Sequence, residues 1–389
     1  MVFVINDPDF CIDAFTQAVD VTFARHAVLR TRFAKVGEDD FMQMVQVRTA
    51  PTIECTNLLG MSAAEQAAVI SRHLTQSVAD SFDVAADAPL IRFDLFWCAQ
   101  EMWQLVMTTH HAIADGWGMV ELMAELEQVY RQRSVGAVGE AATVAVNGMK
   151  EHVALEIQAA DNRLERQFWE HRIADIVPMM LPRVLPADVG GTEVREFALT
   201  GSRLQELKHQ AAMSHVPLKI LFLAAYSNSL ARVLDRHQVV VDVVSNGRSN
   251  RLSDPLHALG LFWSFLPIGV SSMSVTSDML RELHACVLDA EAHAAFPVRQ
   301  LLRAQGVSDL TCAAFNFVHF HHDQPHRAAL MRFEYGVDRF HHPLQLVVSL
   351  SPDATNVHVA LHAAATPVVA EIAAALSHEL GEWIAAEPT

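Results

Sequence analysis

The sequence predicts an α/β protein of two lobes, and three observations support that prediction. Strand-like and helix-like segments alternate in both halves of the chain, as in mixed α/β layers. The chain has 389 residues, 51% of them apolar, which is more than one hydrophobic core usually holds. Proline and glycine gather at residues 181–193, as is typical of a boundary. We therefore expect an N-terminal lobe over residues 1–180 and a C-terminal lobe over 181–389.

The first half of the chain is predicted as strands and helices in alternation. Apolar side chains at Met119, Leu122, Met123, Leu126 and Tyr130 recur at intervals of three and four residues, which indicates an amphipathic helix. Two apolar runs separated by Ala-Gln-Glu indicate a β-hairpin. In chain order, we expect a short first strand, a helix that leads into a second strand over 10–33, a helix over 65–80, hairpin strands over 89–98 and 102–111, a helix over 119–133, a surface loop over 134–149 and a helix over about 150–172.

The second half has the same mixture of elements, without a repeat of the sequence itself. Thr366 and Pro367 predict a helix start, because threonine caps helix N-termini and proline suits the first helical position. In chain order, we expect helices over 202–216 and 218–234, strands over 238–246, 260–270 and 312–322, a hairpin over 344–362 that turns at 351–356, and a last helix from Thr366 to about residue 385.

Charge and cysteine content restrict the class of protein. The net charge is −17, whereas a nucleic-acid-binding protein needs a basic surface to neutralise phosphates, so we expect no nucleic-acid partner. The N-terminus lacks the basic start of a secretory signal. The five cysteines show no short spacing, which predicts reduced thiols and a cytoplasmic protein. They are Cys11, Cys55, Cys98, Cys286 and Cys312.

Residues 258–277 carry no charge and are long enough to span a bilayer. Gly260, Pro267, Gly269 and four serines interrupt this run, however. We therefore expect a buried strand with its loop here, and no membrane partner.

The stretch VMTTHHAIADGWGMVELM, residues 107–124, places two histidines at the end of an apolar strand and ahead of a helix. Loops at strand ends often carry chemistry, and a neutral imidazole can take a proton near pH 7 because its pKa is about 6.5. Asp115 could orient a histidine or pair with an arginine elsewhere, and Gly116 permits a positive φ at the turn.

Metal binding is the less favoured interpretation of these histidines. Adjacent strand residues point to opposite faces, so His110 and His111 cannot easily reach one ion. A second group of histidines has no recognisable metal-ligand spacing and is expected at a strand end and surface loop. It comprises His319, His321, His322, His326, His341 and His342. The sequence also lacks GxSxG, GxGxxG and P-loop motifs, which leaves serine hydrolases and nucleotide-binding enzymes without support.

HHAIADG resembles the HHxxxDG motif of the condensation-domain superfamily of acyltransferases, which includes nonribosomal peptide condensation domains, wax-ester synthases and the chloramphenicol-acetyltransferase fold. Further stretches resemble the superfamily in the same order along the chain. They are RHAVLRTRF at 25–33, FWEHRI at 168–173, VVSNGRSNRL at 243–252, LGLFWSFLPIGV at 259–270 and FNFVHF at 315–320. Ser264 stands where the superfamily often has asparagine, and the chain begins closer to RHAVLRTRF than is common.

The resemblance implies two chloramphenicol-acetyltransferase-like lobes that form a V-shaped pseudo-dimer around a central tunnel. It implies that His111 is the catalytic histidine, that His110 is structural, and that Asp115 forms an ion pair with Arg248. Backbone N–H groups near Gly116, or His111 itself, are candidates to stabilise an oxyanion. Trp117 is a possible tunnel residue, although an aromatic side chain at a helix start is more often part of the core. Ser264 and Asn316 are further possible tunnel residues.

The function implied is transfer of an acyl group from a phosphopantetheinyl carrier-protein thioester to an amine or hydroxyl, in nonribosomal peptide or polyketide biosynthesis. No bound cofactor or metal is expected, and the acceptor is a small-molecule nucleophile. The sequence contains no carrier-protein serine motif, so we expect a free-standing enzyme with the carrier on another polypeptide. Two alternatives remain, an acyl-CoA-dependent alcohol or amine acyltransferase and a non-catalytic condensation-like docking domain.

Overall fold

The computed structural model describes residues 1–37, 41–80, 82–136, 148–181, 192–271, 276–319, 330–337, 342–351 and 353–385. Within these residues the chain forms two compact units. The first contains residues 1–153, the segment 248–262 and, from the segment 324–339, the strand β11. The second contains the rest of the described chain.

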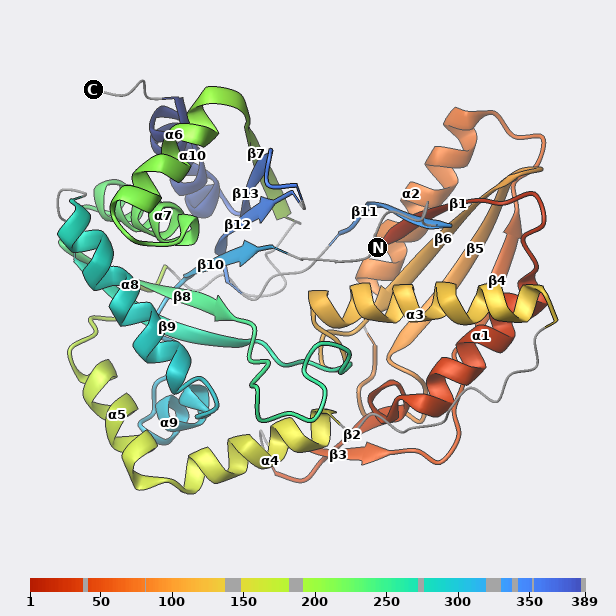
Figure 1. The fold of residues 1–389 in the computed structure, drawn as a ribbon, viewed down its shortest axis with the longest axis horizontal. Helices are drawn as coiled ribbons and strands as arrows, with labels where there is room; N and C mark the ends of the chain where they lie inside the picture. The colour runs from red at the N-terminus through yellow and green to blue at the C-terminus, as the bar shows by residue number, and fades with distance from the viewer. Residues whose placement is uncertain are drawn as a thin grey trace. The chain divides into compact units, whose positions relative to one another are not determined.

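The first unit is built on a five-stranded sheet in the order β11-β1-β6-β5-β4. β1 pairs antiparallel with both β6 and β11, so a strand from near residue 330 lies beside the N-terminal strand (Figure 1). A separate antiparallel pair, β2 and β3, follows the first helix. The strands are β1 (Val2–Asn6), β2 (Thr31–Lys35), β3 (Phe41–Val45), β4 (Ile53–Asn57), β5 (Ile91–Ala99), β6 (Met102–Thr109) and β11 (Met331–Tyr335).

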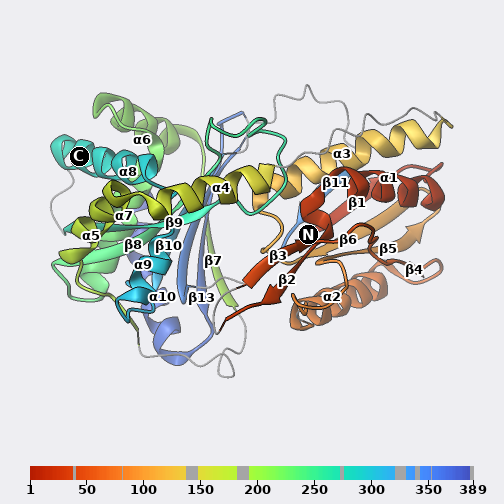
Figure 2. The same ribbon diagram turned by 90° about the horizontal axis from the view of Figure 1, so that it is seen from below.

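Helices cover both faces of this sheet. α1 and α3 pack on one face and α2 on the other (Figure 2). α2 begins with a capping box in which Ser62 and Glu65 bond each other's backbone N–H groups. The helical segments are α1 (Ile12–Arg25), the 3₁₀ turn η1 (Ala27–Arg30), α2 (Ala63–Ala79), α3 (Gly116–Ser134) and the first turns of α4 (Gly148–Asp161).

The second unit has a six-stranded sheet in the order β7-β13-β12-β10-β8-β9, in which β10 runs parallel to both of its neighbours. Helices α6, α7, α8 and α10 pack on one face of it. The strands are β7 (Thr192–Leu199), β8 (Gln238–Ser245), β9 (Ser264–Ser271), β10 (Ala313–Val318), β12 (Leu344–Leu350) and β13 (Val357–Ala364). The helices are α5 (Arg163–Ala174), α6 (Gly201–Met213), α7 (Leu218–Val233), α8 (Ser277–Ala292), α9 (Val298–Ala304) and α10 (Pro367–Ala385).

The mixed α/β architecture was predicted, whereas a single boundary at residue 180 does not describe the two units. The first unit includes Arg248 through Phe262, and β11, because these segments pair with α3 and β1 far away in the sequence. Residues 182–191, most of the predicted boundary, lie outside the described part of the chain.

Two local predictions were also wrong. The helix expected over 150–172 is two helices, α4 and α5, separated at Asn162. The side chain of Asn162 caps α5 by accepting a hydrogen bond from the Leu164 N–H at 2.9 Å. The strand β2 was predicted, as the end of the segment 10–33. Four further strands were not predicted: β3, β4, β7 and β11.

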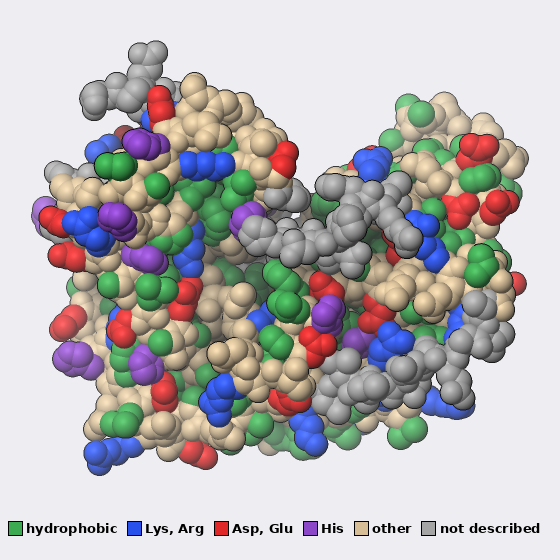
Figure 3. All heavy atoms as spheres, viewed as in Figure 1, with side chains coloured by type: hydrophobic (Ala, Val, Ile, Leu, Met, Phe, Trp, Pro, Cys, Tyr) green, Lys and Arg blue, Asp and Glu red, His purple; other side chains and the backbone are tan. Residues whose placement is uncertain are grey.

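The uncharged run 258–277 contains the buried strand β9, as predicted. Among the described residues, no helix combines the length and apolar character needed to cross a membrane. Acidic and basic side chains are interspersed on the face drawn in Figure 3. All five cysteines are free thiols.

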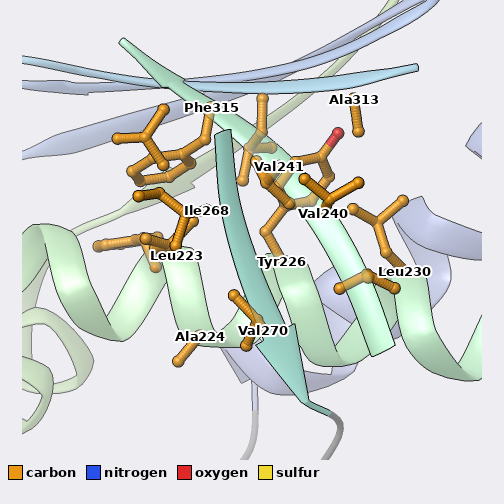
Figure 4. Close-up of a cluster of buried hydrophobic side chains, with 14 of the residues drawn as sticks. Leu223, Ala224, Tyr226, Leu230, Val240, Val241, Ile268, Val270, Ala313 and Phe315 are labelled. Atoms are coloured by element: carbon orange, nitrogen blue, oxygen red, sulfur yellow. The ribbon is translucent and has the colours of Figure 1, made fainter. Parts of the chain in front are cut away.

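The core of the second unit contains a buried hydroxyl. Tyr226 on α7 points its ring into the apolar cluster beneath the sheet, and its oxygen lies near Ala313 in Figure 4. This oxygen is fully buried and has no hydrogen-bond partner among the residues that the structure describes, and burial raises the pKa of the phenol well above 10. Such a group costs free energy, because it loses its bond to water on folding.

We expect Tyr226→Phe to raise the free energy of unfolding by about 1 kcal/mol, because it removes the unsatisfied hydroxyl and leaves the ring in place. Tyr130→Phe is the matched control. The Tyr130 hydroxyl accepts a hydrogen bond from the Cys11 N–H at 3.1 Å and donates one to Asp7 at 3.4 Å, so its loss is expected to destabilise. Thermal unfolding of both variants measures the effect, and an equal loss of stability in both would contradict the prediction.

Candidate active site

The two histidines of HHAIADG follow β6 directly, in the first unit. The His110 N–H donates to the Leu90 carbonyl at 2.9 Å, which holds the end of β6 to the start of β5. The Ile113 N–H then donates to the His110 carbonyl at 3.2 Å and closes a turn before α3. Both histidines are half-buried, whereas Ile113 and Ala114 are fully buried and anchor the turn.

The His111 ring is oriented by the backbone of its own turn. Its Nδ1 lies 3.1 Å from the Ala114 carbonyl oxygen. A carbonyl can only accept a hydrogen bond, so Nδ1 carries the hydrogen and Nε2 holds the basic lone pair of the neutral ring. The geometry therefore assigns Nε2 as the nitrogen that can accept a proton.

The His110 ring has the opposite arrangement. Its Nδ1 accepts the Ala112 N–H at 3.0 Å, so the neutral ring carries its hydrogen on Nε2. The ring lies edge-on to Phe82, with the centroids 6.3 Å apart. Burial lowers the pKa of His110, and the neighbouring His111 lowers it further. These contacts suit the structural role expected for His110.

Asp115 is buried and caps α3. Its Oδ1 accepts the Gly118 N–H at 2.7 Å and an Arg248 Nη2 hydrogen at 2.9 Å, and its Oδ2 accepts the Phe262 N–H at 3.2 Å. The Asp115 N–H donates to the Gly260 carbonyl at 3.0 Å. Its oxygens thus accept three hydrogen bonds, which makes Asp115 a residue that organises the site rather than one that reacts.

The ion pair between Asp115 and Arg248, which the resemblance implied, is present and buried, with side-chain exposures of 5% and 3%. The other end of the guanidinium, Nη1, donates to the carbonyls of Pro255 and Ala258 at 2.9 and 2.7 Å. The Arg248 Cζ atom lies 4.4 Å from the centroid of the Phe262 ring. The Arg248 guanidinium therefore bonds to two carbonyls within the segment 248–262 and joins this segment to the start of α3 through Asp115.

Trp117 and Gly116 form the first turn of α3. Trp117 is half-buried and donates its Nε1 hydrogen to the Leu256 carbonyl at 2.8 Å, so it is a further tie to the segment 248–262. Gly116 does not have the positive φ that was considered for it; in this region Gly247, just before Arg248, does, at φ 60°. Gly260 has φ 156°, which residues with a side chain rarely adopt, and a Cβ there would also lie 2.8 Å from the Met149 Sδ.

Sequence reasoning missed His152, on α4 in the first unit. Its side chain is buried, and its ring centroid lies 5.1 Å from that of Phe262. Burial lowers the pKa of His152, and Asp115 and Arg248 act on it in opposite directions. The helical pattern around residue 152 was recognised, but no local signal connects it to residue 262.

The stretch RHAVLRTRF contributes a partly buried contact to α3. His26 Nε2 lies 2.6 Å from Glu125 Oε2, and Arg25 forms an ion pair with the other oxygen of the same carboxylate. Burial raises the pKa of Glu125, but His26 and Arg25 lower it by more, so the net shift is downward. This contact ties the end of α1 to the middle of α3 and thereby supports the helix that Asp115 caps.

Ser264 and Asn316 belong to the second unit. Ser264 begins β9 on the side of Leu266, which faces the helix layer, whereas Asn316 on β10 alternates with Phe315 and lies on the other face of the sheet. The structure thus places these two residues on opposite faces of one sheet.

The second histidine group is only partly described. His342 is buried, and its Nε2 atom lies 2.8 Å from the Oδ2 atom of Asp242. His319 ends the described segment after β10, and His321, His322, His326 and His341 lie outside the described residues. Within the described residues, no group of three or more His, Cys, Asp or Glu side chains could hold a metal.

Comparisons with known proteins agree with one another. The model of the family described as the condensation domain matches residues 1–358. The AMB antimetabolite synthetase AmbE of Pseudomonas aeruginosa is 28% identical over 317 residues, which are 80% of this chain and 15% of that protein. The chain therefore spans about one seventh of that relative's length.

Two solved structures show the fold. The first condensation domain of the calcium-dependent antibiotic synthetase, in complex with a substrate analogue, matches with a TM-score of 0.75 at 19% identity, covering 99% of this chain and 90% of that one. The X-domain from teicoplanin biosynthesis matches with a TM-score of 0.80 at 18% identity, covering 98% and 89%; a complex of that domain with OxyB is also known. These matches confirm the predicted α/β fold of two lobes.

We expect Asp115→Ala to reduce the free energy of unfolding by roughly 3–5 kcal/mol, because it leaves the buried Arg248 cation without its counter-ion. Arg248→Ala should have a similar effect. Since the two side chains share one contact, the double variant should lose much less than the sum of the single losses. Denaturant unfolding of all four proteins gives this comparison, and simple additivity would argue against the pairing.

We expect the stability of the protein to fall as the pH falls below about 6.5. The pKa values of His110 and His152 are lowered on folding, so between those values and about 6.5 the unfolded chain binds more protons. This contribution is fully present above pH 6.5 and is lost on acidification. Thermal unfolding midpoints between pH 7.5 and pH 5 measure the slope.

His110→Asn should flatten that slope, because asparagine keeps an acceptor near the Nδ1 position but does not titrate. His257→Gln is the control of opposite sign, since its bond to Asp254 raises the pKa of this exposed histidine. Removing it should not flatten the slope. An unchanged slope in His110→Asn would refute the assignment to His110.

Proposed function

Since the chain belongs to the condensation domain family, which forms amide bonds in nonribosomal peptide synthesis, we propose that it is an acyltransferase with His111 as its general base. It joins a thioester-bound acyl group to an amine or a hydroxyl. The observation that carries this proposal is the bond from His111 Nδ1 to the Ala114 carbonyl, which leaves the basic lone pair on Nε2.

The proposed reaction needs one base and no enzyme nucleophile, because a thioester carbonyl is already reactive. His111 Nε2 takes the proton as the amine nitrogen or hydroxyl oxygen attacks the carbonyl carbon. The tetrahedral species then expels the thiolate, which takes a proton and leaves as a thiol. The products are the amide or ester and the free thiol. For an amine acceptor, positioning contributes more than proton removal.

Oxyanion stabilisation is proposed for the N–H groups at the start of α3. A helix N-terminus carries partial positive charge, and that of α3 begins at Gly116, just after the histidine turn. The buried pair of Asp115 and Arg248 would hold this helix end in place. Trp117, Ser264 and Asn316 remain candidate tunnel residues within this proposal.

The donor is proposed to arrive on the phosphopantetheine arm of a carrier protein, with a small molecule as the acceptor. In support, the chain resembles part of an antimetabolite synthetase. An acyl-CoA donor would use the same chemistry on the same arm. The five free thiols are consistent with a reducing compartment such as the cytoplasm.

A non-catalytic docking domain is the second candidate function. The observation in its favour is the TM-score of 0.80 to the X-domain, a domain that has been solved in complex with OxyB. The complete HHAIADG motif and the position of His111 favour catalysis instead.

We expect His111→Ala to lower turnover by roughly 10²–10⁴-fold, because proton removal by a positioned base is lost. The measurement is intact-protein mass spectrometry of acyl-carrier proteins before and after addition of the enzyme and a set of amines and alcohols, with acyl-CoA offered in parallel. Transfer from the carrier but not from CoA supports the carrier-dependent form.

His257→Gln is the matched control, since it removes an exposed histidine that pairs with Asp254 and should leave turnover unchanged. Circular dichroism confirms that both variants are folded. A folded His111→Ala protein with full turnover would overturn the role of His111. If neither wild type nor variant transfers any acyl group, while the protein binds a partner enzyme, the docking function is favoured.

A further inference from the structure

Two helices of the first unit hold the segment 248–262. α3 is bonded to it at Asp115, which accepts hydrogen bonds from Arg248 and from the Phe262 N–H. The first turns of α4, which belong to the same unit, pack on the same segment. The candidate site therefore depends on α4 as well as on α3, because the segment carries the partner of Asp115.

α4 contacts the segment through a carboxylate and a glycine. The Glu151 oxygens accept the Ser253 N–H and the Ser253 hydroxyl, each at 2.8 Å. Gly148 leaves room for Ala258, since a Cβ on Gly148 would lie 2.5 Å from the Ala258 Cβ. The start of α4 is thus fitted closely to the segment.

His152, one turn further along α4, contacts the end of the segment. Its side chain is 7% exposed, and its ring lies edge-on to that of Phe262, with the centroids 5.1 Å apart. The Arg248 Cζ atom lies 4.4 Å from the centroid of the same Phe262 ring, and the Phe262 N–H donates to Asp115. Phe262 is therefore the residue through which His152 contacts the buried ion pair.

A proton on His152 would add a second cation to this balanced pair. Burial lowers the pKa of His152, Asp115 raises it and Arg248 lowers it, with a net shift downward. Further titratable groups on the surrounding elements are Glu151 and Glu156 on α4, Asp254 and His257 in the segment, and Glu121 on α3.

We propose that His152 is a positioning residue of the candidate site, and that its protonation releases the segment 248–262 from α4. Neutral His152 packs on Phe262 and keeps its N–H on Asp115. An imidazolium needs water, so acid favours the state in which the ring has left Phe262 and the segment has opened. The effect on acyl transfer rests on the proposed function, whereas the opening of the segment does not.

Hydrogen exchange followed by mass spectrometry tests this release directly. Exchange of the segment 248–262 is measured between pH 7.5 and pH 5.5 and is corrected for the intrinsic effect of pH on amide exchange. Between the pKa of buried His152 and about 6.5, the open state binds one more proton, so protection should fall by about tenfold per pH unit. Strand β8 of the second unit is the internal reference and should keep its protection.

Two variants remove the proton without removing the side chain. His152→Phe keeps an aromatic ring against Phe262, and His152→Gln keeps a polar side chain if the larger ring is not accommodated. Protection of the segment should no longer depend on pH in either variant. His209→Phe, the same change at an exposed position of α6, is the control and should behave as wild type.

The proposal is overturned if wild type and the two His152 variants lose protection of the segment equally in acid. It is also overturned if β8 loses protection together with the segment in wild type, because that result indicates global unfolding. Loss of protection confined to the segment, and absent from the variants, supports it.

Acyl transfer over the same pH range tests the consequence for the reaction. Below pH 6.5, wild-type turnover should fall more steeply than that of His152→Phe, by up to about tenfold per pH unit, because the positioned site is lost as well as the base. Identical pH profiles would overturn the positioning role. Absence of any transfer by wild type at pH 7.5 would instead refute the proposed function, and the exchange measurement would still decide whether His152 releases the segment.

Discussion

The buried ion pair of Asp115 and Arg248 is the interaction on which the candidate site depends. Two charges with side-chain exposures of 5% and 3% are tolerated because each one is paired with the other and makes further hydrogen bonds. The carboxylate caps α3 and accepts the Phe262 N–H, and the guanidinium holds two carbonyls of its own segment. The start of α3, and the histidine turn that precedes it, are positioned by this arrangement. Chemistry and folding are therefore linked at one pair of side chains.

The two histidines show how a few backbone bonds divide roles between identical side chains. His111 donates from Nδ1 to a carbonyl, whereas His110 accepts an N–H at the same atom. The first ring is left with its basic nitrogen on Nε2, and the second ring is kept neutral as a support.

Local patterns in the sequence predicted the elements that carry their own signal. Amphipathic α3, the β5–β6 hairpin and the motif before α3 are of this kind. The ion pair of Asp115 with Arg248 was implied by the resemblance to the condensation-domain superfamily. The pairing of β1 with β11 could not be predicted, because two short strands more than 300 residues apart leave no local trace. Asn162, by contrast, is a capping residue whose meaning was overlooked. The different faces of Ser264 and Asn316 depend on register, which a single sequence does not specify.

The first unit is built from segments that lie far apart in the sequence, and this has a consequence for protein synthesis. β1 leaves the ribosome before the other strands of its sheet but receives its outer neighbour, β11, only when translation has passed residue 331. Until then β1 is an open sheet edge, and before residue 248 is made Asp115 has no counter-ion. Domains often fold in order as they emerge, yet here the earliest part must wait for the latest. The nascent N-terminal region is thus exposed to aggregation for most of its synthesis, and chaperone demand should be greatest for that region.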